Sequence, residues 1–151
     1  MRVWVIGSTS LLLAACGGEV EPGRALEIGF IQQGLECTAP GMQARLEATG
    51  VVGACPLQVS ADHRVTGVCR EVPAGDVRNF RLVYYYDIGR GPEPEVELAV
   101  VTAALDLRDQ REPTVVLEFP ANRLIKDQND DNDSFTNLQE FCAGTDPRMA
   151  D

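Results

Sequence analysis

The sequence predicts a mainly β protein, an antiparallel β-sandwich followed by a short acidic segment. Between residues 25 and 120, short apolar runs alternate with Gly, Pro and Asp, a pattern typical of strands joined by turns. Many short strands at this spacing favour two packed sheets. The length of 151 residues, 44% of them hydrophobic, suits one domain with one core.

The formal net charge is −10, and the charge is unevenly distributed along the chain. Residues 127–151 contain seven acids and one arginine. An acidic balance of this size argues against nucleic acid as a partner, and against an anionic lipid surface as an electrostatic partner. We therefore expect no nucleic-acid function.

The first fifteen residues have the pattern of a secretory signal peptide rather than that of a folded element. Arg2 supplies one positive charge, residues 3–13 are apolar or small, and two alanines precede Cys16. A short core helix is the alternative, and the small-residue ending disfavours it. The stretch is also too short to span a bilayer.

The ending Leu13-Ala14-Ala15-Cys16 resembles the lipobox of bacterial lipoproteins, in which the cysteine receives the lipid and starts the mature chain. The resemblance implies a signal peptide over residues 1–15 and a membrane anchor on Cys16. Residue 17 is not Asp, which in lipoproteins of enteric type favours the outer membrane. Residues 16–24 are rich in Gly and form a flexible tether. We expect an exported protein on the outer membrane or cell surface, held by its lipid without entering the bilayer.

The predicted strands lie between residues 25 and 122, in the order 44–52, 56–60, 64–72, 78–86, 95–107 and 114–119. Alternation in the fourth range predicts one inward face, formed by Phe80, Leu82, Tyr84 and Tyr86. Alternation in the last range turns Val115, Leu117 and Phe119 inward. β-Branched residues favour a strand over 95–107, although its alanines leave a partly helical alternative open.

One stretch of this region resembles a known family. Val72-Pro73-Ala74-Gly75, followed by Arg78-Asn79-Phe80, is similar to the turn and strand of immunoglobulin-like sandwiches in bacterial surface lipoproteins. In that family a Pro-Ala-Gly turn leads into an alternating strand and a later strand, here 113–120, ends the sandwich. The resemblance implies an immunoglobulin-like topology for residues 25–122, and it concerns the fold, which does not imply a function.

Cysteine usage supports export. Apart from Cys16 the chain has four cysteines, an even number that suits disulfides in an oxidising compartment: Cys37, Cys55, Cys69 and Cys142. Zinc is disfavoured because no Cys-x-x-Cys pair exists and His63 is the sole histidine. Four cysteines allow three pairings. A hairpin centred on Asp62 would place Cys55 opposite Cys69, which favours that bridge and leaves Cys37–Cys142 as the second.

Residues 129–140, NDDNDSFTNLQE, have oxygen donors at the spacing of a twelve-residue calcium loop. The donors at positions 1, 3, 5, 7, 9 and 12 are Asn129, Asp131, Asp133, the Phe135 carbonyl, Asn137 and Glu140. Calcium takes six to eight oxygens, and a Glu at the last position can offer two. Ser134 stands where the motif has Gly, so we expect strain at a left-handed turn there. With only three carboxylates, the expected affinity is roughly 10⁻⁴–10⁻³ M.

An acidic, solvated tail is the alternative to a calcium loop. It does not account for the apolar residues and the cysteine within the run, which are Phe135, Leu138, Phe141 and Cys142. Together with the following Gly144-Thr145-Asp146-Pro147, the loop resembles the thrombospondin type 3 and EF-hand-like repeats of bacterial surface proteins. In those repeats an acidic calcium loop runs into a short helix. The resemblance implies calcium as the cofactor of residues 123–151.

The candidates for catalysis are weak. Asp62 and Ser60 flank His63, but near neighbours on one turn cannot easily converge as a triad. Glu93, Glu95 and Glu97 are more typical of a solvated strand face than of paired catalytic carboxylates. The tyrosines 84–86 alternate and favour core packing over a ligand platform. We predict a non-enzymatic, lipid-anchored surface protein; the alternatives are a glycan- or protein-recognition module and a small hydrolase.

Overall fold

The structure is a computed structural model that describes residues 24–38, 40–49, 53–72, 77–108 and 114–150. The predicted signal peptide, Cys16 and nearly all of the tether lie outside these residues. So does the Pro-Ala-Gly turn at 73–75 that carries the immunoglobulin-like resemblance. No helix in the described ranges has the length and apolar character needed to cross a membrane.

The described chain is mainly β, as predicted. Its strands are β1 (Arg24–Ile31), β2 (Met42–Ala48), β3 (Cys55–Val59), β4 (Arg64–Val72), β5 (Val77–Asp87), β6 (Glu95–Asp106) and β7 (Thr114–Leu117). A 3₁₀ turn, η1 (Ala121–Arg123), and one short helix, α1 (Asn137–Ala143), follow the strands. The strands form one sheet in the order β6-β5-β2-β3-β4-β1-β7. All neighbours are antiparallel except β1 and β7, which are parallel.

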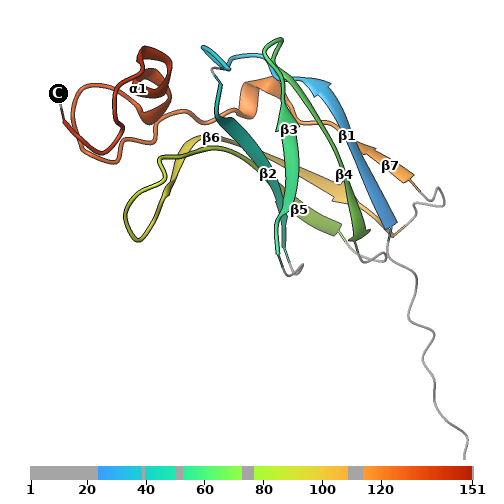
Figure 1. The fold of residues 1–151 in the computed structure, drawn as a ribbon. Helices are drawn as coiled ribbons and strands as arrows, with labels where there is room; N and C mark the ends of the chain where they lie inside the picture. The colour runs from blue at the N-terminus through green and yellow to red at the C-terminus, as the bar shows by residue number, and fades with distance from the viewer. Residues whose placement is uncertain (1–23, 39, 50–52, 73–76, 109–113, 151) are drawn as a thin grey trace, which may run out of the picture.

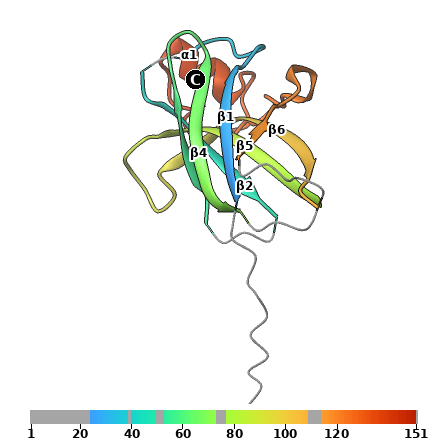
Figure 2. The same ribbon diagram turned by 90° about the vertical axis from the view of Figure 1, so that its right-hand side faces the viewer.

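The sheet curls into a half-barrel around the core (Figures 1 and 2). Strand β3 joins its two halves, because its first residues pair with β2 and Gln58 and Val59 pair with β4. Hydrogen bonding is therefore continuous across the sheet, and two separate sheets, as in a sandwich, are not confirmed.

Two strands differ from the sequence-based expectations. Strand β1 is absent from the predicted ranges, although Leu26 and Ile28 turn inward and Glu27 outward in the usual alternation. Strand β6 is extended along its whole length, so the partly helical alternative is wrong. Residues 98–101 of β6 are buried on both faces, which explains why the sequence there is a continuous apolar run without alternation.

Strand β5 supplies much of the core. Phe80, Leu82 and Tyr84 are at most 1% exposed, as the alternation predicts. Tyr86 is half-buried and its ring packs against Phe141 of α1, with ring centroids 5.0 Å apart. The Tyr84 hydroxyl donates a 3.0 Å hydrogen bond to Oε1 of Gln32, itself 1% exposed. Burial raises the pKa of the Tyr84 phenol well above its ordinary value.

Both disulfides join the cysteines that the sequence favoured. Cys55 pairs with Cys69, with the two Cα atoms 5.7 Å apart, and Cys37 pairs with Cys142. The β3–β4 register is symmetric about Asp62, since Gln58 lies opposite Thr66. The same symmetry brings Cys55 and Cys69 opposite each other, which is the geometry predicted from the hairpin.

Replacing Tyr84 by Phe should lower the free energy of unfolding by about 1–3 kcal/mol, because the buried Gln32 oxygen loses its donor. Tyr85→Phe is the matched control: its hydroxyl bonds to Gln43 at the exposed surface, and we expect a change within about 0.5 kcal/mol. Urea unfolding of the two variants measures the difference. Equal losses would show that the buried Tyr84–Gln32 hydrogen bond contributes no more to the free energy of unfolding than the exposed Tyr85–Gln43 bond.

Candidate metal centre

Helix α1 begins where the acidic loop ends, and its first turn is fixed by a capping box. The Thr136 side chain accepts a hydrogen bond from the backbone N–H of Gln139, and the Gln139 side chain accepts one from the Thr136 N–H at 2.9 Å. Gly144 ends the helix in the left-handed conformation, with φ of 80°. These caps place Glu140 in the first turn of the helix, beside the loop.

The loop is curled by short-range bonds from backbone N–H groups to side-chain oxygens. The Asn132 N–H donates to Oδ1 of Asn129 at 2.7 Å, and the Asp133 N–H donates to Oδ1 of Asp131 at 3.2 Å. The Phe135 N–H donates to Oδ1 of Asp133 at 2.6 Å. Turns of this kind are favoured by Asn and Asp. Oδ1 of each of these two aspartates thus accepts a hydrogen bond from a backbone N–H. Oδ2 of Asp131 is buried without a hydrogen-bond partner.

The curled loop brings three carboxylates together. Asp131, Asp133 and Glu140 each offer one oxygen, and these oxygens lie within 4.8 Å of one another. Glu140 is 1% exposed, while the two aspartates are half-buried. Like charges this close repel, and burial in a medium of low dielectric strengthens the repulsion. A cation would remove the repulsion, so the cluster could hold a metal ion; its oxygen donors suit a hard cation.

The strained residue of the loop differs from the expected one. The left-handed residue is Asn132, with φ of 63°, and Ser134 has no positive φ, so the expectation for Ser134 is wrong. Asn tolerates this region better than most residues because its short polar side chain bonds locally. The chain therefore makes its sharp turn at the fourth loop position, where the sequence carries a residue suited to it.

Two of the other three predicted ligands, Asn129 and Asn137, position the loop in this structure. The Asn129 amide accepts from Asn132 and donates to the Asp133 carbonyl at 2.9 Å. Asn137, fully buried, accepts from the Asp130 N–H and donates to the Glu97 carbonyl of β6. An amide oxygen with one hydrogen bond keeps a second lone pair. Ligation by Asn129, Asn137 and the Phe135 carbonyl stays a prediction.

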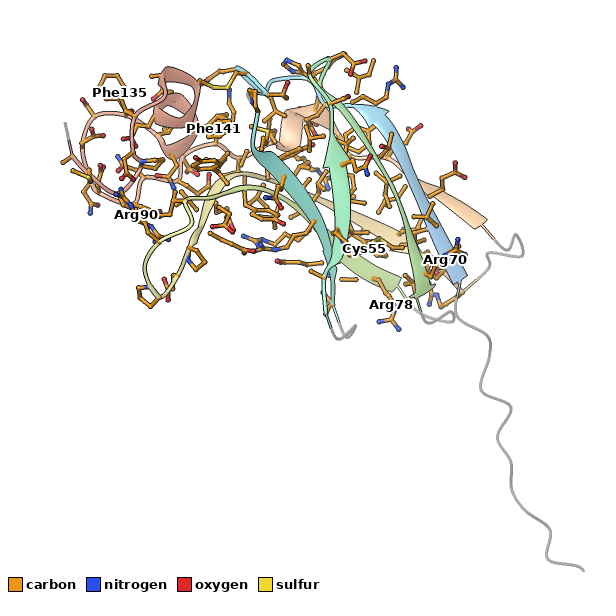
Figure 3. All side chains as sticks on the ribbon, in the orientation of Figure 1. Cys55, Arg70, Arg78, Arg90, Phe135 and Phe141 are labelled. Carbon is orange, nitrogen blue, oxygen red and sulfur yellow. A yellow bond between two sulfur atoms is a disulfide. The ribbon has the colours of Figure 1, made fainter. Side chains whose placement is uncertain are left out.

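Phe135 and Phe141 have different environments. The Phe135 side chain is 49% exposed, whereas Phe141 is 8% exposed and lies between α1 and the sheet (Figure 3). Leu138 is fully buried in the same core. The acidic segment is thus a packed part of the protein in this structure, not a solvated tail.

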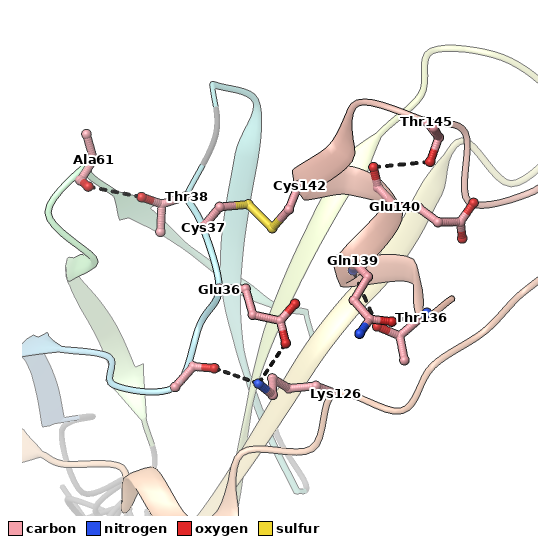
Figure 4. The surroundings of a disulfide bond; sticks show 11 residues. Glu36, Cys37, Thr38, Ala61, Lys126, Thr136, Gln139, Glu140, Cys142 and Thr145 are labelled. Carbon is pink, nitrogen blue, oxygen red and sulfur yellow. Dashed lines mark hydrogen bonds and ion pairs between the residues drawn. A yellow bond between two sulfur atoms is a disulfide. The ribbon is translucent and has the colours of Figure 1, made fainter. Parts of the chain in front are cut away.

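Two basic residues that the sequence analysis did not single out attach this segment to the rest of the chain. Lys126 donates from Nζ to the Gly34 carbonyl at 2.9 Å and pairs with Glu36 at 3.1 Å (Figure 4). Arg148 donates to the Glu93 carbonyl and, at 2.9 Å, to the Glu95 carbonyl. Both contacts span more than fifty residues of sequence, so no local pattern identifies them.

The candidate catalytic groups are engaged in other contacts. Glu95 pairs with Arg45, and Glu97 pairs with Arg81 at 2.6 Å, in a charged network on the outer face of β2, β5 and β6. Glu47 bridges the same two arginines. Burial alone would raise the Glu47 pKa, but hydrogen bonds and positive charge from the arginines outweigh it and lower that pKa.

His63 lies at the β3–β4 turn, in the left-handed conformation with φ of 62°. The Ser60 hydroxyl bonds directly to the Asp62 carboxylate and to the Arg64 carbonyl. In a catalytic triad the histidine would stand between the hydroxyl and the carboxylate. Ser60, Asp62 and His63 therefore belong to a hydrogen-bonded turn and lack the arrangement of a catalytic triad.

Comparison of the chain with protein-family models, with curated proteins and with solved structures gives no match.

Asn132→Ala should lower the free energy of unfolding by roughly 1–2 kcal/mol, because alanine is forced into the left-handed region. Asn132→Gly keeps that conformation accessible and is the control, with little expected loss. Ser134→Gly should bring no gain, since Ser134 has no positive φ. Urea unfolding of the three variants measures these changes. If Ser134→Gly were more stable than the wild type, the strained residue would be Ser134, at the sixth loop position, and the assignment to Asn132 would be wrong.

Proposed function

We propose that this protein is an exported, lipid-anchored, non-enzymatic surface protein whose C-terminal segment binds calcium and is stabilised by it. The observation that carries the proposal is the convergence of Asp131, Asp133 and Glu140 within 4.8 Å on a loop that runs into a capped helix. Their spacing along the chain agrees with positions 3, 5 and 12 of a calcium loop.

The coordination chemistry of the two ions favours calcium over magnesium at this cluster. Calcium binds oxygens at about 2.3–2.6 Å, so oxygens on opposite sides of the ion lie about 4.6–5.2 Å apart. Magnesium requires about 2.0–2.1 Å, which brings opposite oxygens to within about 4.2 Å. The three carboxylate oxygens lie within 4.8 Å of one another, which the wider shell can span. Magnesium would also have to lose water that it holds tightly.

Calcium binding of the proposed strength would stabilise the folded chain only where calcium is abundant. With free calcium at ten times Kd, mass action adds about 1.4 kcal/mol to the free energy of unfolding. An affinity of roughly 10⁻⁴–10⁻³ M belongs to modules that function outside the cytoplasm. The two disulfides suit the same oxidising compartment.

The lipid anchor and the immunoglobulin-like topology belong to the proposal on the strength of the sequence. The lipobox-like ending at Cys16 supports the anchor, and the turn at 72–75 with its following strand supports the topology. Strand β5 follows that turn and alternates as the resemblance implies, but continuous pairing through β3 departs from two separate sheets.

A recognition module is the second candidate, and one observation favours it. A groove of about 450 Å³ crosses the outer face of β1, β3 and β4, lined by Gly29, Pro56, Thr66 and Val68 among others. Val68 is 48% exposed and Gly29 leaves open space above the sheet. A surface glycan or protein is the kind of partner that such a groove fits.

Calcium should bind the full chain in the millimolar range, and Glu140→Gln should abolish the response because the charged ligand at position 12 is lost. Asp127→Asn removes an exposed acid outside the loop and is the charge-matched control, expected to leave binding nearly unchanged. Calorimetric titration at physiological salt measures both, with magnesium as the comparison ion. No heat in the wild type, or an unaltered response in Glu140→Gln, would leave the cluster as a packed acidic turn without a metal.

The native protein should partition into detergent and carry an acylated Cys16 as its first residue. Cys16→Ser should leave an unprocessed precursor, because the lipid acceptor and the cleavage position are lost together. Mass spectrometry of the mature N-terminus decides the matter. A mature chain that begins at any other residue would refute the lipid anchor.

A further inference from the structure

We infer that the Cys37–Cys142 disulfide sets the affinity of the cation site, so that a dithiol reductant weakens calcium binding and calcium in turn opposes reduction. The inference rests on the proposed function, since it concerns the regulation of that site. It assigns to one of the two disulfides a role that the other does not share.

Both ends of the acidic loop are held by the same short segment, residues 34–38, which follows β1. Before the loop, Lys126 bonds to the Gly34 carbonyl and to Glu36. After the loop, Cys142 is bonded to Cys37. Figure 4 shows the two attachments side by side on this segment. Residues 34–38 thus contact the chain both just before and just after the acidic loop.

The exit attachment lies on the same short helix as one proposed ligand. Cys142 stands two residues after Glu140 on α1, a helix of seven residues. Helices this short are marginal without tertiary contacts. Among the described residues, α1 also contacts the sheet through the Tyr86–Phe141 ring pair, the buried Leu138 and the bond from Asn137 to Glu97. Reduction would remove the covalent contact, so Glu140 would be held less firmly against the two aspartates.

The chemical step needs a dithiol, such as dithiothreitol or an exported dithiol protein. Its thiolate attacks one sulfur of Cys37–Cys142, a mixed disulfide forms, and the second thiol of the reductant closes its own disulfide. Two electrons and two protons pass to the protein, which then carries two thiols. Cys37 and Cys142 are both half-buried; in the other disulfide Cys55 is half-buried and Cys69 is 4% exposed.

Linkage makes the effect reciprocal. If the disulfide raises the affinity for calcium by some factor, calcium must shift the dithiol–disulfide equilibrium of that pair by the same factor. Cys55–Cys69 lies in the β3–β4 hairpin and shares no residue or contact with the acidic loop among those described. It should therefore show no dependence on calcium.

The first test is calorimetric titration of calcium into three full-length chains: the wild type, Cys37→Ser/Cys142→Ser, and the matched control Cys55→Ser/Cys69→Ser. We expect Kd to rise by about tenfold in the first variant, a size common for coupled sites, and to stay unchanged in the control. Equal affinities in the wild type and the Cys37→Ser/Cys142→Ser chain would overturn the inference. Absence of binding in the wild type would overturn the proposed function as well, so the two failures are distinct.

The second test keeps the wild-type sequence and does not require any variant to fold. The chain is equilibrated in a dithiothreitol buffer of fixed reduced-to-oxidised ratio, with and without saturating calcium, and the free thiols are mapped by alkylation and mass spectrometry. Calcium should lower the reduced-to-oxidised ratio of Cys37–Cys142 by about tenfold and leave Cys55–Cys69 unaffected. Magnesium at the same concentration is the ionic-strength control. A calcium effect that is equal at both disulfides, or absent at Cys37–Cys142, would overturn the coupling.

Discussion

The Cys37–Cys142 bond is the constraint on which the C-terminal segment depends, because it joins parts of the chain that are 105 residues apart. In the chain-entropy model, closing a loop of about 100 residues contributes about 4.7 kcal/mol, although strain and solvation of the unfolded chain alter the figure. A seven-residue helix could not supply a comparable contribution by itself. The disulfide therefore adds a long-range covalent attachment to a helix and a loop whose local shape is set by the capping box and by bonds from backbone N–H groups to Asn129, Asp131 and Asp133.

In the C-terminal segment, the repulsion between carboxylates is concentrated at one cluster, while basic residues lie near the two ends. Lys126 and Arg148 bind backbone carbonyls and acidic groups at the two ends of the segment, where they attach it to the rest of the chain. The carboxylates of Asp131, Asp133 and Glu140 face one another in the middle. The repulsion is thus concentrated where a cation would relieve it, while the attachments are made by groups that need no metal. Because attachment and cation binding use different residues, the segment can stay packed against the protein without a cation. The strength of the attachments would then affect how tightly a cation binds.

The sequence identified the features that depend on local pattern. Alternation identified the buried face of β5, symmetry about Asp62 identified the partner of Cys55, and spacing identified the three carboxylates. It missed the features decided by contacts far apart in sequence: the parallel pairing of β1 with β7, the continuity of the sheet through β3, and the attachment by Arg148. The position of the strained residue was missed for a different reason. The motif reserves the sixth position for glycine, but this loop is turned by Asn132 through its bond to Asn129.

The start of β1 and the helix α1 lie at opposite ends of the sheet, which determines where the proposed anchor would be attached. Strand β1 begins with Arg24 at the end of the sheet that lies away from α1 (Figures 1 and 2). A tether that leads from Cys16 to Arg24 would therefore join the sheet at the end opposite the acidic segment. Calcium and oxidising conditions, both properties of the space outside the cytoplasm, would then act on the same distal helix through Glu140 and Cys142. Each condition would then strengthen the effect of the other on the attachment of this helix.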